Sequence, residues 1–174
     1  MDKLEILNQD VNEYYERLEK IEFSIINQYT ENLDYCIKAI QDYLNNNQGE
    51  TTISEINRQI MNLGPLLYFA LVGLEKVGIK EDISNQIRLA VYNSARAEAT
   101  GTKEDKNSVA EEKSKQEAII NDLYSRCYKE IKVRCDMGQE LLKSLKKVLS
   151  AKMLEMELTR VQVDSGGPDY TEFD

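Results

Sequence analysis

The sequence has no histidine and no tryptophan, and it contains only 2 prolines, 8 glycines and 3 cysteines among 174 residues. Without histidine the chain lacks the commonest general base, an essential member of the usual catalytic triads and a frequent zinc ligand. We therefore predict a protein that is not an enzyme, with no catalytic residue, metal site, cofactor or small-molecule substrate. The scarcity of glycine and proline also argues against a turn-rich β fold.

The three cysteines are predicted to be reduced core thiols of a cytoplasmic protein. Cys127 and Cys135 lie eight residues apart in a helical pattern, about 12 Å by helical rise, which exceeds the reach of a disulfide. Residues 1–5 are largely charged, so no signal peptide is expected. The most apolar run, residues 66–72, is far shorter than the roughly 20 residues that span a bilayer, so we expect no membrane contact.

The net charge of −9 is unevenly distributed along the chain. Residues 1–60 carry 5 Lys and Arg against 12 Asp and Glu, whereas residues 61–160 carry 17 against 15. The last segment, residues 161–174, has four acids, two glycines and a proline, and is predicted to be a disordered acidic tail. An acidic chain is a poor general binder of nucleic acid, but the slightly basic central region leaves local contact open.

The strongest pattern is an uninterrupted helix over residues 117–158. Eleven positions from Ile120 to Met156 recur at a mean spacing of 3.6, the repeat of a straight α-helix. Such a helix is roughly 60 Å long, so its stripe must be covered by other helices or by other copies of the chain. We predict a homo-oligomer. The expected interface residues are Ile131, Leu142, Leu145, Leu149 and Met153.

The first segment, residues 1–46, is predicted to be a long acidic helix of coiled-coil character. Apolar residues from Leu4 to Ile25 recur at steps of three and four. The spacing slips after Ile25, so either one helix bends near Thr30 or Thr30 caps a second helix. We favour one helix, which should stop at the polar cluster beginning at Asn45.

Residues 50–78 are predicted to form a short helical pair that holds the globular core. Gly64-Pro65 should end the first helix, because proline suits the first turn of the next one, and Gly78 should cap the second. The expected centre of this core is Leu67, Phe69 and Leu74.

Residues 80–160 are predicted to form a long antiparallel helical hairpin with a break near Gly101. The predicted fold class is therefore all-α, an elongated helical bundle built on this hairpin. Two capping boxes could restart the helix after the break: Thr102 with Asp105, and Ser108 with Glu111.

Basic residues are concentrated at one place in the long helix, where Lys143, Lys146 and Lys147 lie close together. They form either the solvated back of the helix or a contact for nucleic acid or an acidic partner.

One stretch of the sequence runs from Val91-Tyr92-Asn93 through Arg96-Ala97-Glu98-Ala99-Thr100-Gly101-Thr102-Lys103 to Lys106. Together with the long helix to Met156, it resembles small helical phage proteins, and most of all the UvsY-type recombination mediators. The resemblance covers residues 80–158. It implies an oligomer in the host cytoplasm that holds single-stranded DNA and helps a recombinase to load, with Arg96, Lys103 and Lys106 facing the strand.

Two functions therefore stay open. One is a mediator-like accessory factor of phage recombination. The other is an acidic helical scaffolding protein or inhibitory adaptor that contacts only proteins. Charge placement distinguishes them, because strand binding requires the basic residues of 61–160 to share one face.

Overall fold

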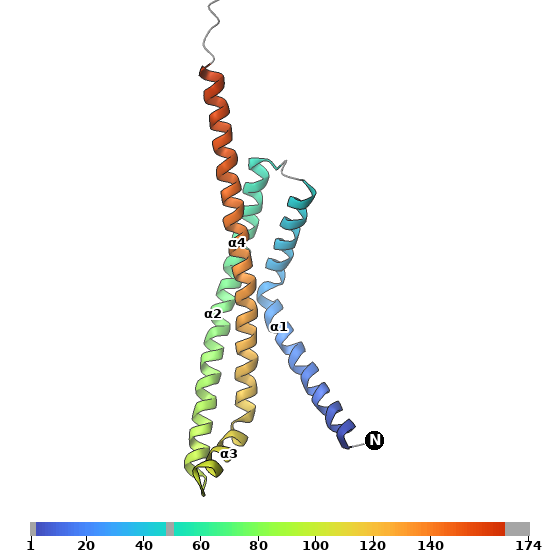
Figure 1. Cartoon of the computed structure of the whole chain (residues 1–174), viewed down its shortest axis with the longest axis vertical. Helices are drawn as coiled ribbons and strands as arrows, with labels where there is room; N and C mark the ends of the chain where they lie inside the picture. Colours follow the sequence, from blue (N-terminus) through green and yellow to red (C-terminus); the bar gives the residue numbers. More distant parts are fainter. Residues whose placement is uncertain (1–2, 48–50, 166–174) are drawn as a thin grey trace, which may run out of the picture.

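The computed structural model describes residues 3–47 and 51–165, and within them it contains four helices and no strand. They are α1 (Lys3–Asn46), α2 (Ile53–Glu98), α3 (Lys103–Lys113) and α4 (Lys115–Ser165). Helices α2 and α4 run antiparallel side by side and share the most extensive contact, with α1 packed along one side (Figure 1). The predicted all-α, elongated fold with a long antiparallel hairpin is confirmed.

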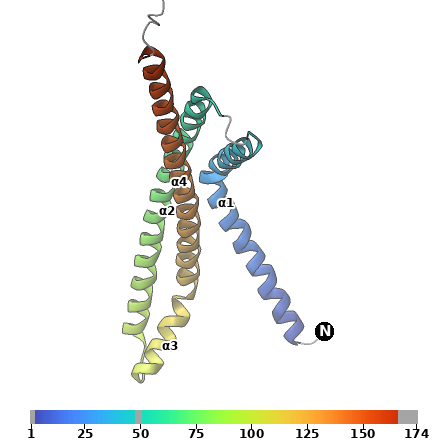
Figure 2. The ribbon, with the colours of Figure 1, turned by 45° about the horizontal axis from the view of Figure 1, so that its top comes forward.

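Helix α1 is a single helix, as predicted, and it bends near its middle. The buried Thr30 hydroxyl donates to the Ile26 carbonyl at 3.0 Å, a back-bond that often bends helices. Figures 1 and 2 show the N-terminal half of α1 diverging from the hairpin after this bend. The alternative in which Thr30 caps a second helix is wrong.

The predicted helical pair within residues 50–78 is wrong, because α2 continues without a break through Pro65 and past Gly78. Pro65 is exposed, so the carbonyl that loses its partner can turn to water. Buried side chains continue at helical spacing on both sides of the proline, and their packing outweighs its cost of about 3 kcal/mol. These buried residues are Ile56, Leu63, Leu67, Ala70, Gly73 and Val77.

The uninterrupted α2 also changes two predictions made from shorter stretches of the sequence: that no segment could span a membrane, and which residues form the centre of the core. By length and composition it is the one helix among the described residues that could cross a membrane, which the sequence was not expected to contain. Core helices of soluble proteins have the same composition, so this property alone carries little weight. Of the three predicted core centres, Leu67 is buried and Leu74 is half-buried, but Phe69 is 51% exposed.

The break near Gly101 is confirmed, and α3 forms the tip of the hairpin. Gly101 has a φ of 112°, which side-chain-bearing residues rarely adopt. Of the two possible capping boxes, the structure uses Thr102 with Asp105: the Asp105 amide donates to the Thr102 hydroxyl at 3.2 Å and the Thr102 amide donates to Asp105 at 2.9 Å. The Thr102 bonds lower the pKa of the Asp105 carboxyl.

The end of α4 overlaps the predicted disordered tail. Residues 161–165 are helical rather than disordered, because α4 continues to Ser165. The rest of that prediction, residues 166–174, lies outside the described residues.

The core lies where the second half of α1 meets α2 and α4, and Gly138 lies where all three helices approach one another. A Cβ at Gly138 would lie 3.2 Å from a methyl carbon of Leu67 on α2 and 3.3 Å from one of Leu33 on α1. The missing side chain therefore lets three helices converge at one level. The buried cluster around it is Ile26, Leu33, Ile37, Ile40, Ile56, Leu63, Leu67, Ala70, Val77, Cys127, Ile131, Cys135 and Leu145.

Beside this core, Arg134 of α4 joins the bend of α1 to the hairpin. Its guanidinium donates to the Thr30 hydroxyl at 2.9 Å and also to the Asp34 carboxylate. Glu130, one turn earlier on α4, lies 3.5 Å from the same guanidinium. The Thr30 hydroxyl, which back-bonds within α1, is thus also an acceptor for α4.

Gly73→Ala is expected to lower the free energy of unfolding by about 1–3 kcal/mol, although alanine is the better helix former. The added methyl group would lie 2.7 Å from the Cβ of Tyr29, so α1 would have to move. Gly64→Ala is the control, because nothing lies within 4 Å of its added carbon. Its change should stay within about 0.5 kcal/mol, since the following proline offsets part of the helix gain. Equal effects in urea denaturation would contradict the close approach at Gly73.

Arg134→Ala should lower the free energy of unfolding by about 1–2 kcal/mol, because it removes a partly exposed charged hydrogen-bond donor from Thr30 and Asp34. Lys132→Ala is the matched control two residues away, where the side chain is exposed. Chemical denaturation of both variants tests this. A loss in Lys132→Ala as large as that in Arg134→Ala would contradict the role of the guanidinium.

Candidate interaction surface

The structure divides the six predicted nucleic-acid-binding residues between two distant places. Arg96 lies in the last turn of α2, and Lys103 and Lys106 lie in the first turn of α3, so these three residues are at the hairpin tip. Residues 96–117 around them carry 5 Lys and Arg against 6 Asp and Glu. Lys113 pairs with Glu98 at 3.8 Å across the tip. The tip is therefore slightly acidic, with its basic side chains among carboxylates.

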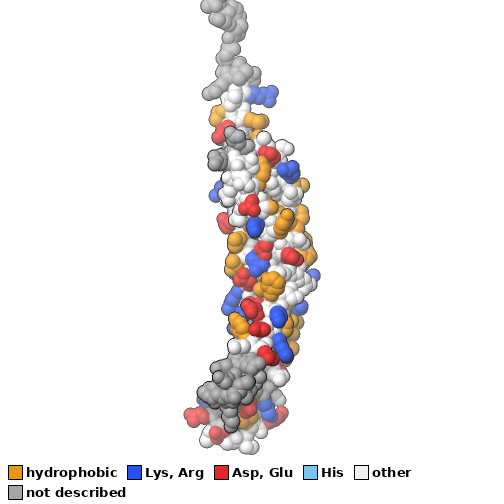
Figure 3. All heavy atoms as spheres, turned by 90° about the vertical axis from the view of Figure 1, so that its right-hand side faces the viewer, with side chains coloured by type: hydrophobic (Ala, Val, Ile, Leu, Met, Phe, Trp, Pro, Cys, Tyr) orange, Lys and Arg blue, Asp and Glu red, His pale blue; other side chains and the backbone are white. Residues whose placement is uncertain are grey.

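The other three, Lys143, Lys146 and Lys147, are exposed on α4. Lys143 lies 28 residues after the start of α4 at Lys115, about 42 Å along the helix from the tip. Its ammonium donates to Glu140 at 2.7 Å, and this hydrogen bond lowers the pKa of the Glu140 carboxyl. On the face that Figure 3 shows, Lys and Arg lie among Asp and Glu rather than in one basic strip.

The five predicted oligomer-interface residues also fall into different environments. Ile131 and Leu145 are buried against their own chain, at 0% and 3% exposure. Leu142 and Leu149 are half-buried against the same core, and Met153 is 50% exposed. The middle of the apolar stripe is thus covered by α1 and α2, whereas its two ends, at Ile120 and from Met153 onward, are exposed by about half or more. Periodicity reveals such a stripe but not which helix covers each part of it.

The last turns of α4 extend beyond the other helices (Figure 1). We call residues 141–161 the basic end, because they carry 5 Lys and Arg against 2 Asp and Glu. Five of their large apolar side chains, all between residues 153 and 161, are exposed by half or more, which is unusual for residues of this size in one short segment. These exposed residues are Met153, Leu154, Met156, Leu158 and Val161.

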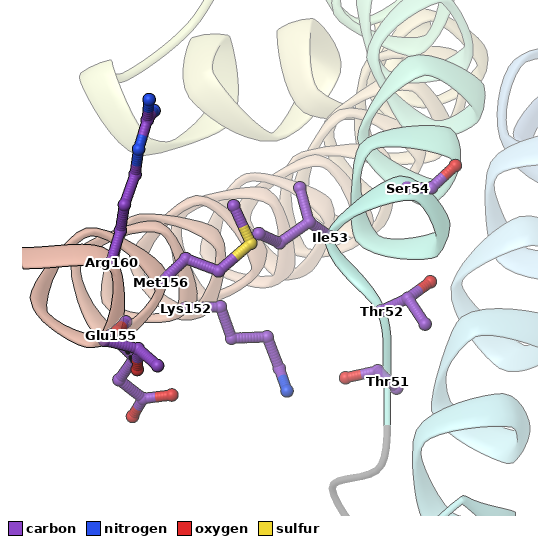
Figure 4. A pocket seen from close by; sticks show the side chains of 9 residues that line it. Thr51, Thr52, Ile53, Ser54, Lys152, Glu155, Met156 and Arg160 are labelled. Atoms are coloured by element: carbon purple, nitrogen blue, oxygen red, sulfur yellow. Dashed lines mark hydrogen bonds between the residues drawn. The ribbon is translucent and has the colours of Figure 1, made fainter. Parts of the chain in front are cut away.

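One side of the basic end forms an open groove of about 820 Å³ with the start of α2. Figure 4 shows Ile53 of α2 and Met156 of α4 pointing toward one another, while the charged ends of Glu155 and Arg160 point away from the groove. An apolar floor with a polar rim suits a peptide or a helix of a partner protein. The lining residues are Thr51, Thr52, Ile53, Ser54, Lys152, Glu155, Met156, Thr159 and Arg160.

The amino end of α2 in this groove is already satisfied by its own capping box. The Thr52 amide donates to the Glu55 carboxylate at 2.9 Å, and the Glu55 amide donates to the Thr52 hydroxyl at 3.2 Å. The bond from the Thr52 amide is the main cause that lowers the pKa of the Glu55 carboxyl. Because a carboxylate of the chain itself occupies this helix end, the groove does not offer an anion site there.

The opposite side of the basic end has a second apolar stripe. Leu154, Leu158 and Val161 follow one another at steps of 4 and 3, so they lie on one side of the helix. Lys147 and Lys143 precede Leu154 by 7 and 11 residues and lie on that same side. We call these five residues the outer stripe.

The first half of α1 is a second place where described apolar side chains are exposed. We call residues 3–25 the acidic arm, because they carry 3 Lys and Arg against 6 Asp and Glu. Where side chains of the predicted seam are described, Tyr14 is 51% and Ile21 is 48% exposed, and Leu18 is half-buried. Small cavities of about 140 and 180 Å³ lie where the arm approaches α4 near Leu123 and Arg126.

The cysteines offer no reactive site. Burial raises the pKa of Cys127 and of Cys135 to about 11, with neighbouring carboxylates adding to the effect. Burial also raises the pKa of the partly covered Cys36. Thiols of this kind are poor nucleophiles at neutral pH. Among the residues that the structure describes, no three His, Cys, Asp or Glu side chains are placed to hold a metal ion.

The heptad spacing of the first segment predicts the seam of the acidic arm, whereas the outer stripe is not among the predicted surfaces. The spacing of Leu154, Leu158 and Val161 was visible, yet it lies beside the main stripe of the same helix and was not separated from it. Comparison of the chain with protein-family models, with curated protein sequences and with solved structures finds no match. The likeness to UvsY-type mediators stays a prediction based on residues 80–158.

Proposed function

We propose that this protein is a non-enzymatic helical scaffold or adaptor that acts through protein–protein contacts at the uncovered parts of its long helices. The observation that carries the proposal is the basic end, where five large apolar side chains are 50–64% exposed within nine residues. Full burial of one such side chain is worth about 1.5–3 kcal/mol, so a partner that covers several of them gains a substantial part of its affinity there.

The placement of charge favours protein contact over strand binding. A strand-binding surface needs Lys and Arg gathered along one path, because affinity for phosphates comes from neutralising several of them together. Here the tip residues Arg96, Lys103 and Lys106 lie among six acids, and the lysines of the basic end lie about 40 Å away. Among the side chains that the structure describes, the predicted strand-binding residues do not form one continuous basic surface that would support the mediator-like function.

For single-stranded DNA we expect no salt-sensitive binding at physiological ionic strength. Fluorescence anisotropy of a labelled oligothymidine, titrated with the full chain at low and at physiological salt, measures this. The control variant carries Arg96→Glu, Lys103→Glu and Lys106→Glu. Binding by the parent that weakens with salt and disappears in the variant would contradict the proposal and support the mediator function.

For protein contact we expect a photo-crosslinking residue at Leu158 or at Met156 to give discrete adducts in cells that naturally contain the protein. The same residue at Lys129, which is exposed on the covered middle part of α4, is the control and should give none. Mass spectrometry identifies the captured chain, whether a second copy or another protein. Absence of a specific protein adduct from both apolar positions would refute the proposal.

A further inference from the structure

We propose that the acidic arm of one copy docks on the outer stripe of a second copy, so that the chain forms an antiparallel two-fold dimer. This inference rests on the proposed function and specifies it, because it names a second copy as the partner of the basic end. Three features of the described residues support it: matching apolar seams, opposite charge and their positions at opposite ends of the molecule.

The two surfaces match in length and in apolar character. The acidic arm has 23 residues and the basic end has 21, about 34 Å and about 31 Å of helix. Each carries exposed apolar side chains: Tyr14 and Ile21 of the arm, and Leu154 and Leu158 of the outer stripe, are each about half exposed. Two seams of this kind can interlock as a helix pair, which buries both at once.

The two surfaces are also opposite in charge. The acidic arm has a net charge of −3, from 3 basic and 6 acidic residues, and the basic end has +3, from 5 and 2. In an antiparallel pair the start of the arm lies near Val161, so Glu22, which lies beside the seam of Tyr14 and Ile21, approaches the level of Lys143. Two acidic arms would repel one another, and so would two basic ends. Charge therefore favours the pairing of an arm with a basic end.

Within one chain these surfaces do not meet. The amino end of α1 lies toward the hairpin tip and the end of α4 lies at the far end of the molecule (Figures 1 and 2). A second copy turned end for end brings its arm to the first copy's basic end, and its own basic end to the first copy's arm. The contact is made twice around a two-fold axis and closes, so no filament follows.

The full chain is expected to sediment as a dimer of about 40 kDa, twice the chain mass of 20.1 kDa, at about 50 µM protein. Two double variants should each weaken dimerisation at least about tenfold. They are Tyr14→Asp with Ile21→Asp on the arm, and Leu154→Asp with Leu158→Asp on the outer stripe. Ile83→Asp with Ile87→Asp is the matched control, because both side chains are 51% exposed on α2 and the spacing is the same as in the outer stripe. Circular dichroism checks that all three variants keep their helices.

A charge exchange tests the pairing itself. Glu22→Lys should weaken the dimer, as should Lys143→Glu, and the combined variant should recover most of the parent's affinity. Recovery would require the two segments to face one another. A combined variant that dimerises more weakly than either single variant would overturn the arm-to-end contact.

Crosslinking of the purified chain separates the possible occupants of the outer stripe. With a photo-crosslinker at Leu158 and an equal mixture of isotope-labelled and unlabelled copies, we expect adducts between copies that map to the start of the acidic arm, residues 3–11. Adducts within one copy to residues 166–174 would instead assign the surface to the chain's own acidic end. A parent that sediments as a monomer, with adducts formed only to another protein in cells, would overturn the dimer and leave the proposed function intact.

Discussion

The packing of α2 against α4 is the interaction on which the rest of the structure depends. It needs a continuous apolar side on each helix, and α2 provides one only because it stays helical through Pro65. Once the two are paired, Gly138 leaves room for α1 to reach both, and the core forms at that level. The position of this core also determines what is left uncovered, since helices of about 50 residues extend well beyond a single contact region.

Helix α1 illustrates how one polar contact can direct an entire segment. Its second half supplies Leu33 and Ile40 to the core, whereas its first half has an equally regular seam, in which the described Tyr14 and Ile21 are about half exposed. The change occurs at Thr30, whose hydroxyl back-bonds within α1 and accepts from Arg134. A helix bent at this point cannot keep its whole seam on the hairpin. The exposed seam is therefore a consequence of the bend and not of a weak apolar pattern.

Local features of the fold could be predicted from the sequence, but the choice of partner for each face could not. The 3.6 spacing identified α4, the heptads identified α1, and Thr102 with Asp105 marked the restart after Gly101, because each depends on neighbouring residues. The predicted helix break at Gly64-Pro65 was wrong, because the tertiary packing of Leu63 and Leu67 outweighs the cost of a proline inside the helix. The candidate surface was found only in part. Whether Leu145 or Leu158 is exposed depends on how far α2 extends along α4, which no local pattern encodes.

Exposed apolar surface and charge together narrow what such a molecule can do. A monomer with half-exposed leucines at Leu154 and Leu158 would be a poor final state, since soluble proteins seldom leave an extended apolar face unpaired. Phosphate backbones would be attracted by the lysines of the basic end but would leave these leucines in water. A partner that covers the leucines must carry apolar side chains of its own, and acidic residues beside them would also pair with the lysines. The chain itself carries a segment of that description in residues 3–25, and the shape of the fold prevents its use within the same copy.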